Sequence, residues 1–553
     1  MRNTPFAALD SSCRLYAGTR RALPQTARNL MDRKHRRFAI GQNKGPKHVL
    51  LRGPILRSSL PLALTGIALK PGRSQSRQLY GALRALIIGT PESGGCKLPA
   101  SRDLAAMLAV SRNTVVNVYE RLYSEGFVEP RIGDGTYVAD LRQSHAGAAD
   151  SRGPVEVQEL VNARQNLAAP FDLHPVHDGA PRAFRIGMPA IDQFPFEIWS
   201  RLQARFWRRL PTLQMGYGDP AGDLQLRTLI GHYLHNARGL RCDVSQILIT
   251  SGAQQAISLC AALLLRNGDK VVIENPCYWA AAGALSCFGA KLQGVGVDED
   301  GLITAELAGI KTARIAYVSP SCQYPTGATL SLGRRLELLR WAQERHAWII
   351  EDDYDGEYRY SGTPLTPLAA LDQSNRVVYV GSFSKVMYPG LRLGYMVIPP
   401  QLVKDLTLLR TMSDRQPPIS DQAVMASFIA DGHFQQHVRR MRRAGLARRD
   451  ALRDAWDRHL NQIGSMTQVS SGLHVLIRLP SAERESLLIR LAKEAGVEIT
   501  ALSPLWLPGS KANEIGRFGL ILGFAGIPTL DIYNAVIKLK AAWQRLSGLL
   551  QPC

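Results

Sequence analysis

The sequence predicts an α/β protein made of a small helical unit followed by a large unit built on a mostly parallel sheet. Two observations carry this prediction. Apolar residues at helical spacing lead into a glycine-rich hairpin that ends near residue 140, and beyond residue 183 short apolar runs alternate with helical stretches. At 553 residues the chain is too long for one ordinary core. We therefore divide it into folded units at 59–140 and 183–550, preceded by 1–58 and separated by 141–182.

Composition places the chain among water-soluble globular proteins. It is 45% hydrophobic and 20% charged, and no apolar run reaches the roughly 18 residues that a membrane span needs. We therefore expect no membrane association. The eight cysteines show neither paired metal-ligand spacing nor a dense disulfide framework. We expect reduced thiols, a cytoplasmic location and no metal site.

The first 58 residues carry about half of the positive excess. They hold 13 Lys and Arg against two acidic residues, while the whole chain has a net charge of +21. This stretch has little periodicity and lacks the apolar core of a signal peptide. It is predicted to be a disordered extension, or an over-long start with the true first residue near Met31. An arm that clings to DNA is the alternative.

Helical periodicity begins near residue 75. The segment 76–90 places four apolar residues on one stripe, namely Leu79, Leu83, Leu86 and Ile87. Ser101 is predicted to cap a short helix that carries Leu104, Met107 and Leu108. After a turn at Ala109 and Val110, Ser111 is predicted to cap the next helix.

That next helix has an apolar side and a polar front. Its apolar residues recur at i, i+3, i+4 and i+7, and they are Val115, Val118, Tyr119 and Leu122. Arg112, Asn113 and Thr114 project from its exposed first turn. The following "FVEPRIGDGTYVA" predicts a hairpin, with Arg131 at its base. A generic small helical domain with solvated polar residues would share these features singly, but their order is more specific.

The order helix, helix, turn, helix, hairpin, with "LPASR", "SRNTV" and "GTYV", resembles closely the winged helix-turn-helix of GntR-type regulators over about 75–140. The resemblance implies a double-stranded DNA operator as partner. It assigns phosphate and base contacts to Arg102 and Arg112. Four further residues are expected at the DNA, namely Ser111, Asn113, Thr114 and Arg131. Residues 141–182, rich in Ala, Gly, Ser and Pro, are predicted to be a linker.

From residue 183 apolar strand-like runs alternate with helices. The predicted strands are "QILIT", "KVVIE", "RIAYVSP", "AWIIEDDY" and "VVYVGS". Such alternation indicates a mostly parallel sheet that is covered on both faces. Ligands of these sheets gather beyond the carboxyl ends of the strands, and the polar motifs of this chain follow its strands.

Two of these motifs predict an anion site. "TSGAQQA" places Ser251, Gly252, Ala253 and Gln254 between a strand and a helix start, where free backbone N–H groups bind phosphate. "SFSKVMYPGLR" supplies the hydroxyls of Ser382 and Ser384 and the guanidinium of Arg392, which can chelate the same anion. Many strand-helix turns carry Ser-Gly for steric reasons alone, so the prediction of an anion site depends on the two motifs together.

Two more motifs complete the predicted site. Asp352 follows a buried strand and can hold a heteroaromatic nitrogen protonated, with the Tyr354 phenol two residues on. Tyr278 in "NPCYW" can stack on a flat ligand. An amine beside a phosphate site has its pKa lowered by neighbouring cations and burial, which suits it to bond to an aldehyde. Lys385 is therefore predicted to be a Schiff-base lysine rather than a surface lysine.

Over about 183–545 the chain resembles the fold-type I aminotransferases, which bind pyridoxal 5′-phosphate (PLP) and carry a smaller C-terminal subdomain. From residue 75 on, it resembles the MocR/GabR-type members of the GntR family, with "YGDPAG", "SGAQQ", "NPCYW", "CQYPTG", "EDDYD" and "SFSKVMYPGLRLGY" as the shared motifs. The resemblance implies PLP as cofactor and a head-to-tail homodimer. It also implies that Tyr217 reaches the phosphate of a partner subunit.

Two departures from the aminotransferases bear on function. Cys322 and Tyr324 replace the family's His and a variable aromatic, and the asparagine that touches the cofactor's phenolic oxygen is absent. Ile521 stands where aminotransferases hold the substrate carboxylate with arginine; Arg517 lies nearby. Losing that charged pair costs on the order of 2–5 kcal/mol. We expect a transcriptional regulator that senses PLP or a related amino compound and is no efficient enzyme. The alternative is a working aminotransferase with an appended DNA-binding domain.

Overall fold

A computed structural model describes residues 64–70, 74–140, 171, 182–210, 215–509 and 516–544. The chain divides into two compact units, with the division after Pro154. The predicted extension 1–58, and the predicted linker apart from Phe171 and Arg182, lie outside the described residues. Phe171 packs edge-on against Trp279, with ring centroids 5.6 Å apart. This end of the predicted linker therefore contacts the large unit.

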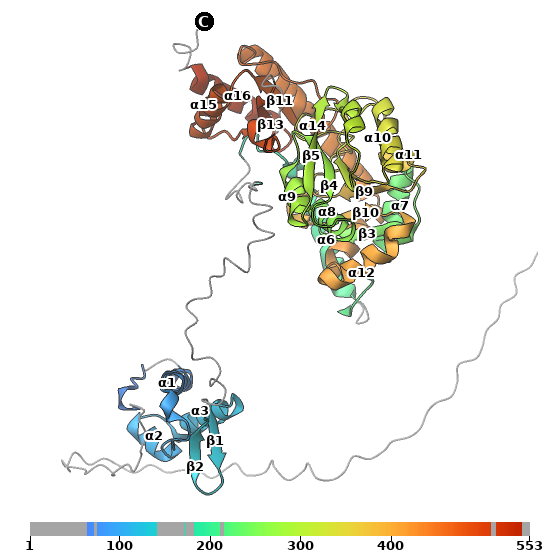
Figure 1. Ribbon diagram of the computed structural model, residues 1–553. Coiled ribbons are helices and arrows are strands. Elements are labelled where there is room, and N and C mark those ends of the chain that lie inside the picture. The colour runs from blue at the N-terminus through green and yellow to red at the C-terminus, as the bar shows by residue number, and fades with distance from the viewer. Residues whose placement is uncertain are drawn as a thin grey trace, which may run out of the picture. The chain divides into compact units, whose positions relative to one another are not determined.

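Within its described residues, the small unit contains three α-helices and a hairpin, beside two short 3-10 helices. Figure 1 shows these α-helices and the hairpin. They are α1 (Gln75–Gly89), α2 (Ser101–Met107), α3 (Arg112–Ser124), β1 (Val128–Arg131) and β2 (Gly135–Val138). The predicted apolar stripes form one core: Leu79, Leu83 and Ile87 of α1 are buried, and Leu86 is partly buried. The apolar stripe of α1 packs against that of α3, and the burial of these two stripes on each other forms the core of the unit.

The helix starts follow the capping prediction in one case only. The Ser111 hydroxyl accepts a hydrogen bond from the Thr114 backbone N–H at 3.1 Å, so Ser111 caps α3. The prediction for Ser101 was wrong, because the N-cap of α2 is Ala100 and Ser101 is the first helical residue. Its hydroxyl instead lies 3.5 Å from Nε of Arg112.

The hairpin is the predicted wing, with one residue misplaced. Strands β1 and β2 pair antiparallel, and Arg131 pairs with Gly135 directly beside the turn. Arg131 therefore lies at the turn end of the wing, not at its base as predicted. Its guanidinium lies over the Tyr137 ring at 4.0 Å, which holds it against the outer face of the hairpin.

The large unit is built on an eight-stranded sheet in the order β3-β10-β9-β8-β7-β4-β5-β6. The strands are β3 (Ile247–Thr250), β4 (Lys270–Asn275), β5 (Lys291–Asp298), β6 (Gly301–Leu302), β7 (Ile315–Val318), β8 (Trp348–Asp353), β9 (Val377–Ser382) and β10 (Gly394–Val397). Strands β5, β4, β7, β8 and β9 run parallel, while β10 is antiparallel to both β3 and β9. The five predicted strands are β3, β4, β7, β8 and β9, while β5, β6 and β10 were missed.

Helices cover both faces of this sheet, as its buried apolar strands require (Figure 1). One layer contains α8 (Ala253–Leu264), α9 (Trp279–Cys287) and α12 (Val403–Asp414). The other contains α6 (Phe196–Arg209), α7 (Leu224–Arg238), α10 (Leu332–Glu344), α11 (Leu368–Leu371), α13 (Ile419–Ala430) and α14 (His433–His459). The predicted doubly covered α/β architecture is confirmed.

The smaller C-terminal subdomain is an antiparallel sheet in the order β11-β13-β12, packed on helices (Figure 1). Its elements are β11 (His474–Leu479), α15 (Ala482–Glu494), β12 (Thr500–Ala501), β13 (Phe518–Gly523) and α16 (Thr529–Gln544). The long helix α14 leads into it and packs on α16. None of the helices in the described part of the chain is long and apolar enough to cross a membrane.

Candidate functional site: a lysine and a phosphate-binding turn

The predicted site residues meet at the carboxyl edge of the parallel strands. Strands β8 and β9 end there, followed by Tyr354 and by Lys385 respectively. Because β10 runs antiparallel, its first residue Gly394 pairs with Thr250 at the end of β3 and with Ser382 at the end of β9. The antiparallel strand thereby brings the β3–α8 turn and the "SFSK" segment side by side.

The β3–α8 turn has the shape of an anion-binding helix start. Gly252 precedes α8 with φ +86°, a conformation that side chains rarely adopt. A Cβ on Gly394 would lie 2.9 Å from the Gly252 Cα, so both positions need glycine for this close approach. The unpaired N–H groups of the first helical turn, including those of Ala253 and Gln254, are available for a phosphate.

Arg392 lies against this turn. Its Nη2 donates to the Ser251 carbonyl at 2.8 Å, and its guanidinium carbon would lie 3.4 Å from a Cβ on Gly252. Arg392 is exposed and adopts φ +50°. On the other side, the Ser384 N–H donates to the Ser382 hydroxyl at 3.2 Å. The predicted phosphate residues thus surround one turn.

Asp352 is a buried carboxylate with one free oxygen. Its Oδ2 accepts a hydrogen bond from the Tyr317 hydroxyl at 2.6 Å, while Oδ1 is buried and has no hydrogen-bond partner among the described residues. Burial raises the pKa of Asp352 to about 6, and the Tyr317 bond opposes that rise. A buried acceptor without a donor fits a protonated ring nitrogen. Tyr317 was missed because a tyrosine in an apolar strand reads as core.

Lys385 has the environment expected for an amine that reacts while neutral. Its Nζ donates to the Gly187 carbonyl at 3.0 Å, and its own carbonyl accepts from the Tyr358 hydroxyl at 2.7 Å. Burial lowers the pKa of Lys385, and the carboxylates of Asp355 and Asp352 oppose this. Of the two predicted causes, burial is the largest influence on the pKa of Lys385, and no neighbouring cation is among the causes. Gly187 was not predicted, since a lone glycine carries no sequence signal.

Two aromatic residues complete the surroundings. The buried Tyr354 hydroxyl has no hydrogen-bond partner within the described residues, and burial raises its pKa well above the usual value. It is therefore a neutral donor for a ligand oxygen. Tyr278, directly before α9, is 39% exposed and meets the Tyr324 ring edge-on, with centroids 5.9 Å apart. One side of this ring stays accessible to a planar ligand.

The two sequence departures have clear structural consequences. Both ends of the Gln323 amide are already bonded: Nε2 donates to the Pro276 carbonyl after β4, and Oε1 accepts from Thr326 in its own loop. Gln323 therefore does not replace the absent asparagine. Ile521 is fully buried, in an apolar cluster with Leu476, Leu502 and Leu505. Ile186, which precedes the Gly187 that binds Lys385, packs against the same cluster.

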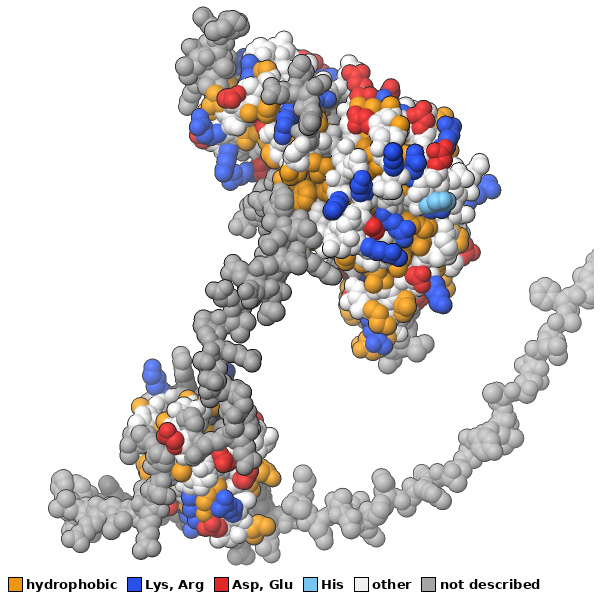
Figure 2. Space-filling model, in the orientation of Figure 1, with side chains coloured by type: hydrophobic (Ala, Val, Ile, Leu, Met, Phe, Trp, Pro, Cys, Tyr) orange, Lys and Arg blue, Asp and Glu red, His pale blue; other side chains and the backbone are white. Residues whose placement is uncertain are grey.

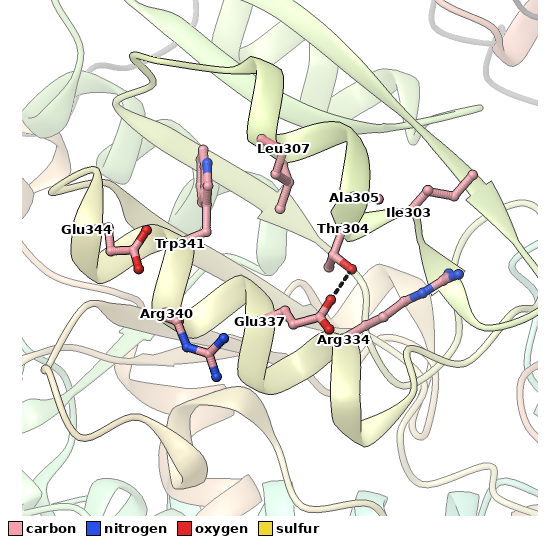
Figure 3. A pocket seen from close by; sticks show the side chains of 10 residues that line it. Ile303, Thr304, Ala305, Leu307, Arg334, Glu337, Arg340, Trp341 and Glu344 are labelled. Carbon is pink, nitrogen blue, oxygen red and sulfur yellow. Dashed lines mark hydrogen bonds between the residues drawn. The ribbon is translucent and has the colours of Figure 1, made fainter.

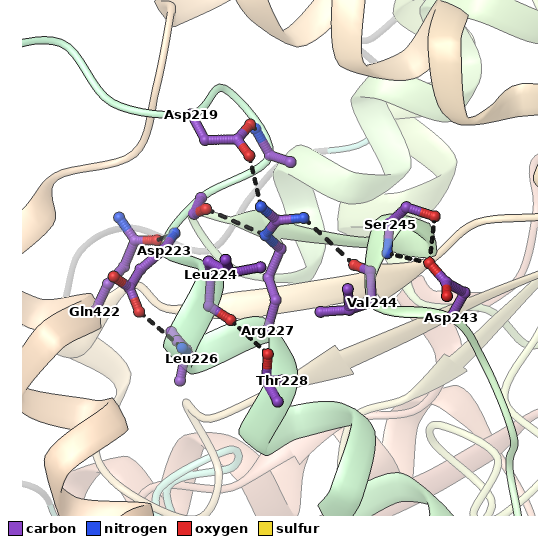
Figure 4. A network of polar contacts seen from close by, with 12 residues as sticks. Asp219, Asp223, Leu224, Leu226, Arg227, Thr228, Asp243, Val244, Ser245 and Gln422 are labelled. Carbon is purple, nitrogen blue, oxygen red and sulfur yellow. Dashed lines mark hydrogen bonds and ion pairs between the residues drawn. The ribbon is translucent and has the colours of Figure 1, made fainter. Parts of the chain in front are cut away.

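Tyr217 is held on the surface by the turn that follows it. Arg227 donates to Asp219 at 2.5 Å and to the Gly222 carbonyl at 3.1 Å, and Gln422 accepts from the Asp223 N–H at 2.8 Å (Figure 4). These bonds fix the "GDPAG" turn. Tyr217 is 79% exposed, so its side chain is not buried in the predicted phosphate site of its own chain. Its predicted role in a partner subunit stays a prediction.

Five of the six predicted DNA-contacting residues lie at the starts of α2 and α3, and Arg131 lies at the turn end of the wing. Arg102, Arg112 and Asn113 are exposed at the starts of α2 and α3. The Ser111 and Thr114 hydroxyls lie 2.8 Å apart and are occupied by capping. Ser111 and Thr114 therefore hold the helix start, whereas the contacts of Arg112 and Asn113 with DNA stay predictions.

A surface cavity lies elsewhere in the large unit. It measures about 590 Å³ and is lined by α10 and the turn 303–308, with Arg334, Glu337 and Trp341 among its residues (Figure 3). The Thr304 hydroxyl donates to Glu337 at 2.5 Å across it. No predicted site residue lines this cavity. It has no part in the site around Lys385.

A winged helix with exposed arginines at its helix starts, together with a doubly covered sheet that carries a lysine beside a turn suited to an anion, defines a class: a DNA-binding unit fused to an aminotransferase fold. Residues 210–518 match the aminotransferase class I and II family, and residues 75–138 match the bacterial regulatory proteins of the gntR family. The chain belongs to the MocR/GabR type of gntR-family proteins, which combine these two parts.

Similarity to individual proteins extends over nearly the whole chain. It is 35% identical to the probable rhizopine catabolism regulatory protein MocR of Rhizobium meliloti, over 85% of this chain and 94% of that protein. It is 30% identical to the pyridoxine biosynthesis regulator PdxR of Corynebacterium glutamicum, over 84% and 95% respectively. Among solved structures, LysN, an α-aminoadipate aminotransferase from Thermus thermophilus complexed with N-(5′-phosphopyridoxyl)-L-leucine, matches with a TM-score of 0.61. That match is 29% identical and covers 66% of this chain and 93% of LysN.

The raised pKa of Asp352 predicts a pH-dependent gain in stability when the carboxylate is removed. In the cofactor-free protein, a carboxyl whose folded pKa lies near 6 destabilises the fold progressively as pH rises from about 4 to about 6. Asp352→Asn should therefore stabilise the cofactor-free protein by about 1–3 kcal/mol at pH 7.5 and by almost nothing at pH 4.

Urea unfolding followed by tryptophan fluorescence measures this, because all eight tryptophans lie in the large unit. Asp405→Asn, at an exposed position of α12, is the control and should change stability at neither pH. An equal gain for Asp352→Asn at both pH values would contradict the assigned cause.

Proposed function

We propose that this protein is a DNA-binding transcriptional regulator whose aminotransferase-like unit binds PLP at Lys385 and senses PLP or a related amino compound. One observation carries the proposal: the free buried oxygen of Asp352 and the Lys385 amine meet at the same sheet edge as the phosphate-binding turn. That combination of a ring-nitrogen acceptor, an amine and an anion site suits a phosphorylated pyridine aldehyde. The regulators among its relatives support the DNA-binding role.

Each predicted residue has a role toward the cofactor. The backbone N–H groups of the turn at Gly252, Ala253 and Gln254 bind the phosphate. They are assisted by three side chains: the hydroxyls of Ser382 and Ser384 and the guanidinium of Arg392. When bound, PLP supplies an aldehyde for bonding to an amine and a pyridinium ring that withdraws electrons.

The remaining contacts orient the ring. Asp352 would accept a hydrogen bond from the protonated ring nitrogen, Tyr354 would donate one to the phenolic oxygen, and Tyr278 would cover one face of the ring. Lys385, whose pKa is lowered by burial, is the amine that bonds to the aldehyde. The printed name of the PdxR relative, a regulator of pyridoxine biosynthesis, supports PLP or a close derivative as the signal.

The apolar cluster at Ile521 favours a sensor over an enzyme. An amino-acid carboxylate placed beside Ile521, Leu476 and Leu505 would be buried without a charged partner, which costs several kcal/mol. We infer that the protein turns over amino acids slowly at most. The alternative, a working aminotransferase with a DNA-binding appendage, is supported by the enzymes that share its fold.

We further propose a head-to-tail homodimer located in the cytoplasm. Hydrophobic side chains gather at the α12 end of the large unit (Figure 2). Leu408 and Met412 of α12 are exposed, as are Met215 and Tyr217 in the neighbouring turn. An apolar surface of this kind suits a second copy, which would place each Tyr217 at the other subunit's phosphate.

The central test compares DNA protection with and without PLP. Wild type should develop a visible absorbance band with PLP that borohydride renders permanent, and PLP should change its pattern of protected genomic DNA. Lys385→Ala should lose the reducible band and the response to PLP, because the covalent amine is gone. Lys404→Ala, an exposed lysine of α12, is the control. A reducible adduct in Lys385→Ala would overturn the assignment.

Arg112→Ala should weaken binding to a protected DNA sequence by about 1–3 kcal/mol and reduce discrimination against mutated sites, if Arg112 contacts a base edge. Arg77→Ala removes an equally exposed arginine on α1 and should have little effect. Titration of labelled duplexes with intact and mutated sites measures both. Equal weakening on all sequences would make Arg112 a phosphate contact instead.

Ile521→Arg should speed transamination of at least one common amino acid, since it restores a charged partner for the carboxylate. Ile521→Met keeps the site apolar and should not. The buried charge should also lower stability. Half-reactions followed by absorbance measure the rates. If the wild type turns over amino acids at about 1 per second or faster, an ordinary enzyme rate, the sensor hypothesis is wrong and the working aminotransferase takes its place.

A further inference from the structure

A chain of hydrogen bonds runs from the phosphate-binding turn to a buried arginine of α12. The Ser251 carbonyl accepts from Arg392, and the Ser251 N–H donates to Oε1 of Gln255 at 2.8 Å. Nε2 of Gln255 donates to Oδ2 of Asp414 at 2.9 Å. Oδ1 of Asp414 lies 3.0 Å from Nε of Arg410 in an ion pair. The two arginines thus stand at opposite ends of one continuous path.

The chemistry of Asp414 fixes the direction of this path. An ionised carboxylate only accepts hydrogen bonds, so it selects the orientation in which Gln255 presents its NH₂ group to Asp414. The amide oxygen must then face the Ser251 N–H. With that N–H occupied, the N–H groups left for an anion begin at Gly252. The amide of Gln255 therefore decides which backbone donors face the ligand.

Arg410 explains why an acidic residue is tolerated close to an anion site. Its side chain is fully buried, and none of its three nitrogens has a hydrogen-bond partner among the described residues, although the Asp414 ion pair remains. Burying a guanidinium with a single carboxylate partner costs desolvation free energy, so this ion pair adds little to the stability of the fold. The guanidinium does offset the negative charge of Asp414, which would otherwise repel a phosphate bound at the turn.

The same end of α12 also holds the Tyr217 turn. The Arg415 guanidinium lies over the Tyr217 ring at 4.0 Å, and Gln416 accepts a hydrogen bond from the Gly218 N–H. Arg415 has φ +66°, a rare conformation for a residue with a side chain. The residues around Asp414 are thus fixed from both sides, which restricts the carboxylate that orients Gln255.

We propose that Gln255, Asp414 and Arg410 form a positioning relay that makes the Lys385 site selective for the phosphate group of its ligand. This inference rests on the proposed binding of PLP. The three residues touch no ligand themselves: Gln255 orients the Ser251 peptide and, through it, Arg392, while Arg410 compensates the charge of Asp414. Loss of the relay should weaken binding of the phosphate and leave attachment of the ring at Lys385 unaffected.

The test compares PLP with pyridoxal, which has the same ring and aldehyde but no phosphate. Gln255→Met and Asp414→Asn in the full chain should each raise the dissociation constant for PLP roughly three- to tenfold, the equivalent of one lost hydrogen bond. The constant for pyridoxal should stay the same. Titration of the visible absorbance band yields both constants. Asp405→Asn, on the first turn of α12, is the control and should change neither.

A double-mutant cycle tests the role of Arg410. Arg410→Met leaves the Asp414 charge uncompensated, so it should weaken the binding of PLP more than Asp414→Asn does. The double variant, Arg410→Met with Asp414→Asn, should recover part of the affinity that Arg410→Met loses. Should any of the single variants fail to fold, Arg410→Met with Asp414→Asn still decides, because it removes both charges of the pair and leaves no buried arginine without a partner.

The outcomes separate the relay from the proposed function. Equal weakening of PLP and pyridoxal, or no weakening of either, would overturn the relay while PLP binding by wild type stands. A wild type that binds neither compound at Lys385 would overturn the relay and the proposed cofactor together.

Discussion

The burial of Asp352 at the carboxyl end of β8 is the constraint on which the site depends. A carboxylate there is buried and, at one oxygen, has no hydrogen-bond donor in the part of the chain that the structure describes. Burial holds its pKa near 6, so the cofactor-free site stores unfavourable energy that a protonated ring nitrogen would relieve. The same low-polarity surroundings lower the pKa of Lys385. Acid and amine are thus prepared for one ligand by the same desolvation.

Strand direction determines what meets at this edge. Parallel strands alone would bring together the ends of β8 and β9, but the antiparallel β10 adds the β3–α8 turn and Arg392. Glycines at 252 and 394 allow the two turns to approach within contact. The order of the strands therefore assembles the site. Asp414 of helix α12 contacts the β3–α8 turn through its hydrogen bond with Gln255.

Sensor and enzyme differ in this fold by what lies beside the amine. Ile521 belongs to an apolar cluster that reaches Ile186, one residue from the Gly187 carbonyl bound by Lys385. An amino acid would have to place its charged carboxylate against this cluster, whereas in the proposed function the phosphate, ring and aldehyde of PLP would each have a matched partner. The proposed site thus contains partners for a cofactor, while the cluster at Ile521 offers a substrate carboxylate no charged partner. A regulator needs the partners for a cofactor only.

The sequence by itself determined the two-unit organisation, five strands of the main sheet and the local motifs, because helical periodicity, strand alternation and short motifs are encoded by neighbouring residues. Lys385, Asp352 and the turn at Gly252 could be predicted for that reason. Only the tertiary structure decided which distant groups complete the site. Tyr317 on Asp352, Gly187 on Lys385 and Asp414 on Gln255 carry no local signal, since each looks like an ordinary core, loop or surface residue. Strand order and helix packing bring them into place.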